Sequence, residues 1–271
     1  MTLPPPADAG GLSGAVPIAT VSVVIPTLNE ADNLRLLLPT IPGWIGEVII
    51  VDGRSTDETV RVAEAFARGR RLSIVMEPRK GKGAALHAGF HAAHSDIIVA
   101  LDADCSMHPC EIPLLAAALM AGADFAKGSR FIQGGGTADM SWFRSMGNWG
   151  LMQIVNVLYG GSFSDLCYGY FAFWRRHLSV IDPTCDGFEV ETFIKLQALK
   201  AKLRIAEVPS FETLRIHGRS NLRAIPDGIR VLRTILRERY VASRAVEDAF
   251  GMQDPQALRR FAPPSDTLST P

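Results

Sequence analysis

IIVALDADCS, residues 97–106, is the part of the sequence that says most about the fold. Its first half is a continuous apolar run without helical spacing, which is typical of a strand buried on both faces of a parallel sheet. The run ends in two carboxylates one residue apart, Asp102 and Asp104. Because ligands of open α/β sheets bind outside the carboxyl ends of the strands, we expect both side chains at a ligand-binding rim.

Two aspartates at such a rim have two interpretations. Hard divalent cations take oxygen ligands and keep some positions for a substrate such as a diphosphate, so Asp102 and Asp104 are candidate metal ligands. The alternative is a pair of solvated turn residues that cap the next helix. A D-x-D pattern is too short to decide between them.

Strand and helix patterns alternate through the first half of the chain. Besides the run at 97–101, apolar runs at 21–25, 48–51, 72–76 and 123–126 predict strands, with helical segments between them. This alternation predicts an α/β fold with a central, mostly parallel sheet flanked by helices. The turn after the first strand is not G-x-G-x-x-G, and the chain has no P-loop, which disfavours dinucleotide-binding and P-loop enzymes.

The second half is less regular. Gln133–Gly136 is expected to be a flexible loop, and helices are expected at 142–159 and 188–199. Strands are expected at 171–174 and 203–211, and a basic amphipathic helix at 225–240. That last helix is suited to rest on anionic lipid.

Composition limits the class of protein. Lys plus Arg equals Asp plus Glu, 28 each in 271 residues, so no overall field favours nucleic acid. The four cysteines form no C-x-x-C pair and are read as reduced thiols of a cytoplasmic protein. No signal peptide or spanning segment is recognised, so any membrane contact is expected to be peripheral, on the cytoplasmic face. Residues 1–19 are expected to be a disordered leader, and 241–271 a flexible tail.

Seven motifs, in order, resemble those of the family-two glycosyltransferases of GT-A fold, most closely the branch with dolichyl-phosphate mannose and polyprenyl-phosphate glucose synthases. The motifs are VVIPTLNE (23–30), VDGRSTDET (51–59), RKGKGAAL (79–86), LDADCS (101–106), KGSRF (127–131), GFEVE (187–191) and RIHGRSN (215–221). The resemblance covers about residues 20–240. It implies one Rossmann-like GT-A domain, with a nucleotide-sugar-binding half at 20–130 and an acceptor-side half at 131–240.

The resemblance also implies an activity: inverting transfer of a hexose from a nucleotide-sugar, of GDP-mannose or UDP-glucose type, to a polyprenyl or dolichyl phosphate. Asp102 and Asp104 become ligands of Mg²⁺ or Mn²⁺, with Ser106 near a further ligand position. Lys82 is preferred to Lys80 as a donor contact. The residues implied on the nucleotide-sugar side are Pro26, Leu28, Glu30, Asp52, Lys82, Asp102 and Arg215.

On the acceptor side the resemblance implies Arg130, Arg144 and Ser220. Arginine suits the task because its planar guanidinium meets phosphate with two hydrogen bonds and stays charged. A structural salt bridge is the alternative for each arginine.

The implied catalytic carboxylates are Asp104, Glu191, Glu189 and Asp165. An acceptor hydroxyl would need a general base, whereas an ionised phosphate would not. The synthases have Gln at the position of Glu189, so this extra carboxylate keeps a hydroxyl acceptor in polysaccharide, glycolipid or natural-product synthesis as the alternative. Two further classes stay open, a non-catalytic nucleotide-sugar-binding subunit and a nucleotidyltransferase. The motifs distinguish neither the sugar, the base nor the oligomeric state.

Overall fold

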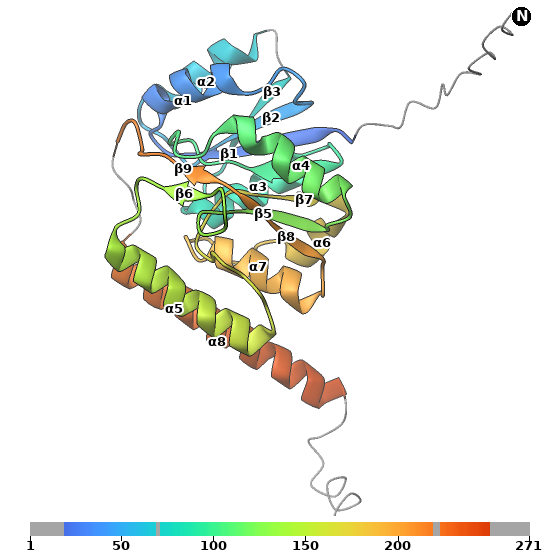
Figure 1. The fold of residues 1–271 in the computed structure, drawn as a ribbon. Helices are drawn as coiled ribbons and strands as arrows, with labels where there is room; N and C mark the ends of the chain where they lie inside the picture. Colours follow the sequence, from blue (N-terminus) through green and yellow to red (C-terminus); the bar gives the residue numbers. More distant parts are fainter. Residues whose placement is uncertain (1–18, 69–70, 219–222, 250–271) are drawn as a thin grey trace, which may run out of the picture.

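The computed structural model describes residues 19–68, 71–218 and 223–249, which form a central sheet covered by helices (Figure 1). The sheet has seven strands in the order β3-β2-β1-β4-β7-β5-β8. Only β7 runs antiparallel to its neighbours among these strands. The predicted α/β fold with a mostly parallel sheet is therefore confirmed. The strands are β1 (Val21–Thr27), β2 (Glu47–Asp52), β3 (Leu72–Met76), β4 (Ile97–Ala100), β5 (Phe125–Ser129), β7 (Phe171–Trp174) and β8 (Ile205–Pro209).

Helices cover both faces of this sheet, because successive side chains of a strand point to opposite faces and those on each face are apolar. In β1, Val23 and Ile25 belong to one core and Val24 to the other. The first core includes α1 (Ala31–Leu37), α2 (Thr59–Ala67) and α4 (Ile112–Met120). The second includes α3 (Lys82–Ala92), α6 (Leu178–Ile181) and α7 (Val190–Lys200). Three short 3-10 helices, η1 (Leu38–Thr40), η2 (Pro109–Glu111) and η3 (Arg175–His177), complete these layers.

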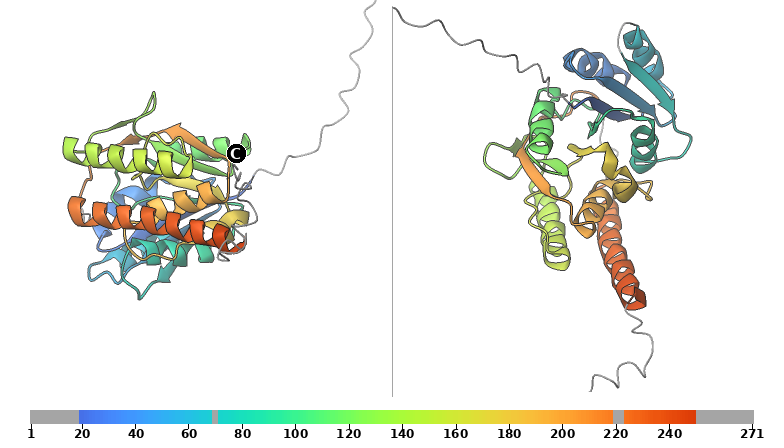
Figure 2. Two further views of the ribbon diagram at one scale, coloured as in Figure 1. Left: turned by 90° about the horizontal axis from the view of Figure 1, so that it is seen from below. Right: turned by 90° about the vertical axis from the view of Figure 1, so that its right-hand side faces the viewer.

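Two long helices form a further layer, α5 (Trp142–Tyr159) and α8 (Ala224–Ala249). They lie side by side against α7 (Figure 2). A third apolar core joins them and includes Val155, Leu196 and Ile235. Among the described residues, no helix has both the length and the apolar character that crossing a membrane requires.

Many predicted bounds differ from the observed ones by one or two residues, and three differences are larger. Strand β5 runs on to Ser129, because the buried Lys127 is neutralised by Glu207 at 2.8 Å and can therefore sit in a sheet. The predicted glycine loop ends in β6 (Gly136–Thr137), which pairs with β9 (Phe211–Glu212).

The third difference is in the predicted flexible tail. Helix α8 does not end at Tyr240 but continues to Ala249, since no glycine or proline interrupts residues 241–249. The rest of that tail, and the leader up to residue 18, lie outside the described residues.

The sheet topology brings the polar strand ends together. Thr27 at the end of β1 is in register with Asp52 at the end of β2, and Val24 is in register with Ala100 of β4. The segment that follows β4, with both aspartates of the D-x-D motif, therefore begins at the same sheet edge.

Candidate active site

Two cavities meet at this edge of the sheet. The first, called here the sheet-edge cavity, is lined by the turn after β1, the start of α3 and the segment after β4. The second, the helix-side cavity, lies between that segment, α5 and α8. The residues that line both cavities form their junction: Lys82, Asp102, Asp104, Phe188 and Arg215.

Ion pairs organise the junction into two acid–base–acid clusters. Lys82, the first residue of α3, places Nζ 2.6 Å from Oδ1 of Asp102 and 2.5 Å from Oε1 of Glu191 in the first turn of α7. Arg215 places Nη2 2.7 Å from Oδ2 of Asp104 and Nη1 3.2 Å from Oε1 of Glu30. Four carboxylates thus share two cations.

Burial and charge shift the pKa values in opposite directions. Burial raises the pKa of Asp102 to about 6, despite the attraction of Lys82. Burial acts in the same way on Glu191, but there the charges of Lys82 and Lys195 prevail and hold the pKa below its usual range. Glu191 is therefore an ionised partner for Lys82, and its lowered pKa makes it a weak base.

The junction fits a divalent cation. The side chains of Asp102 and Asp104 are 24% and 13% exposed, and both line both cavities. Ser106 fixes Asp104 by donating from its amide and its hydroxyl to Oδ1, at 3.0 Å and 2.6 Å. When all are ionised, the four carboxylates and two cations of the two clusters carry a net charge of −2. The available ligand atoms are oxygens, as Mg²⁺ and Mn²⁺ prefer. Asp102 and Asp104 would hold such an ion where a diphosphate entering either cavity would meet it.

The residues predicted for the nucleotide-sugar mostly gather here. Pro26, Leu28 and Glu30 line the sheet-edge cavity together with Lys82, Asp102 and Arg215, while Lys80 is exposed and lines neither cavity.

Asp52 differs, because it is fully buried. Its Oδ2 accepts from the amides of Arg54 and Ser55 at 3.0 Å and 2.9 Å. Its Oδ1 has no hydrogen-bond partner in the described part of the chain, and the neighbouring Gly53 lines the sheet-edge cavity.

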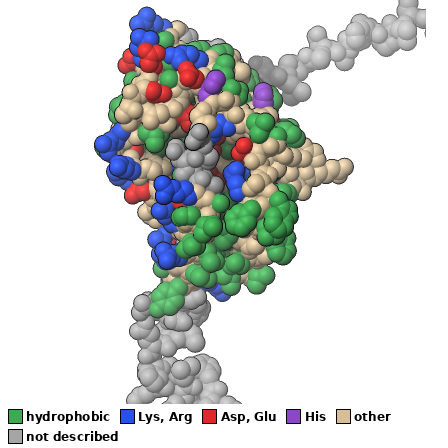
Figure 3. Space-filling model, turned by 90° about the vertical axis from the view of Figure 1, so that its left-hand side faces the viewer, with side chains coloured by type: hydrophobic (Ala, Val, Ile, Leu, Met, Phe, Trp, Pro, Cys, Tyr) green, Lys and Arg blue, Asp and Glu red, His purple; other side chains and the backbone are tan. Residues whose placement is uncertain are grey.

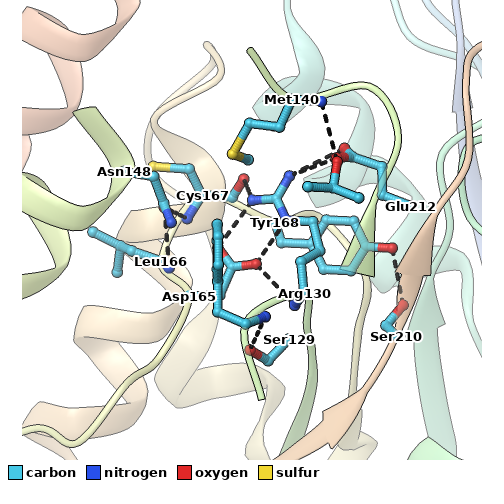
Figure 4. A network of polar contacts seen from close by, with 12 residues as sticks. Ser129, Arg130, Met140, Asn148, Asp165, Leu166, Cys167, Tyr168, Ser210 and Glu212 are labelled. Atoms are coloured by element: carbon cyan, nitrogen blue, oxygen red, sulfur yellow. Dashed lines mark hydrogen bonds and ion pairs between the residues drawn. The ribbon is translucent and has the colours of Figure 1, made fainter. Parts of the chain in front are cut away.

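Arg130 lies in a buried polar network (Figure 4). Its Nε and Nη2 donate to Asp165 at 2.7 Å and 2.9 Å, its Nη1 donates to Glu212 at 3.0 Å, and its Nη2 also donates to the carbonyl of Cys167 at 2.9 Å. The ring of Tyr168 lies 4.5 Å from the guanidinium. This is the structural salt bridge that the sequence allowed, and Arg130 also lines the helix-side cavity, where an acceptor contact was expected.

Asp165, expected near the acceptor, lies behind this arginine. It is fully buried and lines neither cavity. Burial alone would raise the pKa of Asp165, but the ion pair with Arg130 brings it below its usual range. The carboxylate therefore holds Arg130 in place.

The remaining acceptor-side predictions have separate positions. Arg144 lines the helix-side cavity, is 30% exposed, and pairs with Asp139 at 3.3 Å. Glu189 precedes α7 and lines neither cavity, and its Oε2 is buried without a hydrogen-bond partner among the residues described. Ser220 lies outside the described residues.

Sequence reasoning missed Glu212 and Phe188. Glu212 is a single acid in the two-residue strand β9, with no pattern around it that indicates a partner. Phe188 lies inside the motif GFEVE, beside the predicted site residues Glu189 and Glu191, and it lines both cavities. An aromatic residue within a polar motif was the available signal.

Known proteins with similar sequences point to a family for this chain. The family model described as Glycosyl transferase family 2 matches residues 22–182. Dolichol-phosphate mannosyltransferase of Pyrococcus furiosus is 29% identical over 210 residues, which cover 75% of this chain and 59% of that protein. Polyprenol monophosphomannose synthase of Mycolicibacterium smegmatis is 31% identical over 217 residues, covering 76% of this chain and 82% of that protein.

A solved structure is similar in fold. It is glucosyl-3-phosphoglycerate synthase from Mycobacterium tuberculosis in complex with Mn²⁺, UDP-glucose and phosphoglyceric acid, with a TM-score of 0.61 and 25% identity, covering 82% of this chain and 80% of that one. The chain spans about three fifths of the length of several curated relatives that it matches. With more than half of its residues matched by the family model, the chain belongs to glycosyl transferase family 2.

Proposed function

We propose that the chain is a divalent-cation-dependent, inverting glycosyltransferase that moves a hexose from a nucleotide-sugar to a polyprenyl phosphate. The observation that carries this proposal is that the helix-side cavity joins the acidic junction to an apolar wall. Arg144 is among the residues that line this cavity. The apolar wall consists of Met140, Phe143, Leu151 and Val231. Such a cavity suits a molecule with a phosphate at one end and a hydrocarbon chain behind it.

The relatives support both substrates. The names of the Pyrococcus and Mycolicibacterium proteins specify dolichol phosphate and a polyprenol. The Mycobacterium synthase was crystallised with Mn²⁺ and UDP-glucose. We accordingly assign residues 20–130 chiefly to the donor and residues 131–240 chiefly to the acceptor.

The proposed reaction is a single displacement. An oxygen of the acceptor phosphate forms a bond to the anomeric carbon, while the bond from that carbon to the nucleoside diphosphate breaks and its electron pair leaves with the diphosphate. A bound divalent cation supplies the positive charge that neutralises this leaving group. Asp102 and Asp104 would hold the cation, Arg215 would contact the diphosphate, and Arg144 would orient the acceptor phosphate. Because that phosphate is already ionised, no general base is needed.

Product analysis tests the proposal. Purified protein with Mn²⁺ or Mg²⁺ is incubated with labelled GDP-mannose or UDP-glucose and polyprenyl phosphate in detergent, and the organic phase is extracted. A polyprenyl-phosphate hexose identified by its mass is the expected product with one of these donors. If label is transferred only to the hydroxyl groups of added sugars or glycerate, the acceptor is a hydroxyl and not a lipid phosphate. Absence of any transfer, with the donor still bound, would favour the non-catalytic binding subunit.

Glu191→Gln is expected to lower kcat/KM about 10²-fold, because Lys82 loses one of the two carboxylates that position it. Glu189→Gln is the matched control, since Glu189 lines neither cavity, and its effect is expected to stay within about threefold. Steady-state kinetics of both variants provide the comparison. Equal losses at both positions would point to a pair of acids serving an acceptor hydroxyl.

A surface next to the helix-side cavity is suited to a lipid bilayer. Hydrophobic side chains gather on the face formed by the starts of α5 and α8, with Lys and Arg side chains beside them (Figure 3). Trp142 and Trp149 are 74% and 62% exposed, and Phe143, which also lines the cavity, is 54% exposed. The exposed apolar residues at the starts of these two helices, named here the bilayer face, are Trp142, Phe143, Met146, Trp149, Ile225 and Ile229. We propose that this bilayer face rests on the membrane that holds the acceptor.

Combined Trp142→Ala and Trp149→Ala substitution is expected to weaken vesicle binding about tenfold or more, because the bilayer face loses its two largest apolar groups. Cosedimentation with vesicles containing anionic lipid measures this. Trp44→Ala is the matched control, since Trp44 is 52% exposed but precedes β2 at the opposite sheet edge. Equal binding by the natural chain and both variants would contradict the assignment of this face.

A further inference from the structure

We infer that His87, His91 and Asp182 form a second metal site, separate from the acidic junction and suited to Zn²⁺ or a similar transition metal. The two histidines stand four residues apart on α3, so they project from one face of the helix. Asp182 directly follows α6 and faces them. Among the described residues, these are the only three His, Cys, Asp or Glu side chains whose possible ligand atoms all lie within 4.8 Å of one another.

The distances suit one ion. Nε2 of His91 lies 2.9 Å from Oδ2 of Asp182, and Nε2 of His87 lies 3.7 Å from Oδ1. Tetrahedral Zn²⁺ with bonds of about 2.0–2.1 Å places its ligand atoms roughly 3.3 Å apart, which is midway between these values. The imidazole rings already lie together, with centroids 4.6 Å apart. Small side-chain adjustments would therefore complete three protein ligands, with water in the fourth position.

An unsatisfied acceptor points to the same ion. Oδ1 of Asp182 is buried and has no hydrogen-bond partner in the part of the chain that the structure describes. A buried acceptor in this state is costly, and a cation would remove the cost. Arg79 opposes binding, because its Nη2 lies 3.5 Å from Nδ1 of His87. Its side chain is half exposed and already paired with Glu77, so it can turn away when Nδ1 carries the proton.

The ligand set also separates this site from the junction. Imidazole nitrogen favours Zn²⁺, Ni²⁺ or Cu²⁺ over Mg²⁺ and Mn²⁺, whereas the all-oxygen set of Asp102 and Asp104 favours the latter two. Each site should therefore fill with its own ion from a mixture. These three residues would hold a metal whether or not the chain transfers a sugar.

The position of the site gives the ion a structural effect. Helix α3 begins with Lys82, and the segment from Asp182 to Glu189 leads to Glu191, the other partner of that lysine. This segment already packs on the start of α3, where the amide of Gly83 donates to the carbonyl of Asp186 at 2.8 Å. A side chain at Gly83 would overlap the carbonyl of Cys185, so the contact is tight. A metal at the histidines would join the same two segments a second time.

Metal titration of the full, untagged chain tests the inference, with millimolar Mg²⁺ present to occupy the junction. Zn²⁺ in hundredfold excess over its Kd is expected to raise Tm by about 5 °C or more. Co²⁺ is expected to bind one ion per chain with the visible absorption of a tetrahedral site. Hydrogen exchange of residues 182–189 is expected to slow when Zn²⁺ is added.

The variant His87→Ala with His91→Ala is expected to lose the Zn²⁺-dependent shift and the Co²⁺ absorption. Its Tm in EDTA should match that of the natural chain, because both histidines are partly exposed. Asp182→Asn should weaken Zn²⁺ binding at least tenfold. The exposed His94, which contacts Glu47 instead, provides the control His94→Ala, with binding unchanged. Zn²⁺ binding that survives the double variant, or that is absent from the natural chain, would overturn the inference.

Discussion

Asp104→Asn is expected to lower kcat/KM for glycosyl transfer about 10³-fold, roughly 4 kcal/mol of transition-state stabilisation. An amide keeps the shape of the side chain and its contact with Ser106, but it lacks the charge that a divalent cation needs. The fold should remain intact, because one member of a crowded acidic cluster is neutralised and Arg215 keeps its pair with Glu30. Steady-state kinetics and a Tm measured on the same preparation check both parts.

The matched control is Asp96→Asn. Asp96 precedes β4 at the opposite sheet edge, where it accepts hydrogen bonds from the amide and hydroxyl of Thr20. Its activity should remain near that of the natural chain. Full activity of Asp104→Asn would show that the carboxylate is a capping residue of the turn, which is the second interpretation that the sequence allowed.

Arg130→Ala is expected to lower the free energy of unfolding by about 3–5 kcal/mol, since it leaves the buried carboxylates of Asp165 and Glu212 unpaired. Urea unfolding measures the change. Arg204→Ala is the control, because Arg204 pairs with Asp124 at 2.9 Å on the surface and should cost about 1 kcal/mol or less. A stable Arg130→Ala variant with a raised KM for the acceptor alone would instead show that Arg130 binds the acceptor phosphate.

The surroundings of Asp104 and of Arg130 differ in burial and in charge. The junction gathers more acid than base and is partly exposed, so its charges are available to a cation and a substrate. The network around Arg130 is buried and each nitrogen of the guanidinium is engaged, so its charges hold the chain segments together. The same residue types are therefore suited to binding in one place and to structure in the other.

The sheet was largely predictable from the sequence because each buried strand is a short apolar run. Phe171–Trp174 has its predicted bounds, and so does the helix Trp142–Tyr159. The prediction failed where polar residues enter a buried strand. Lys127 ends an apolar run in the sequence, yet it lies inside β5, because its partner Glu207 is 80 residues away and belongs to another strand.

The same limit applied to the site. Motif spacing placed Asp102, Asp104 and Lys82 correctly at one sheet edge, because each follows a strand or begins the next helix. It did not reveal that Lys82 would reach Glu191, 109 residues away, nor that Asp165 would bind Arg130. Which distant charged side chains pair depends on how the chain folds, and local sequence motifs do not reveal this.

The claim that a cation joins the protein to the diphosphate is tested by calorimetric titration of the natural chain with GDP or UDP, once with Mn²⁺ and once with EDTA. If Asp102 and Asp104 hold a cation against the diphosphate, the preferred nucleotide should bind at least about 100-fold more weakly in EDTA, and Asp104→Asn should lose the effect of Mn²⁺. Equal nucleotide affinity with Mn²⁺ and with EDTA would contradict the claim.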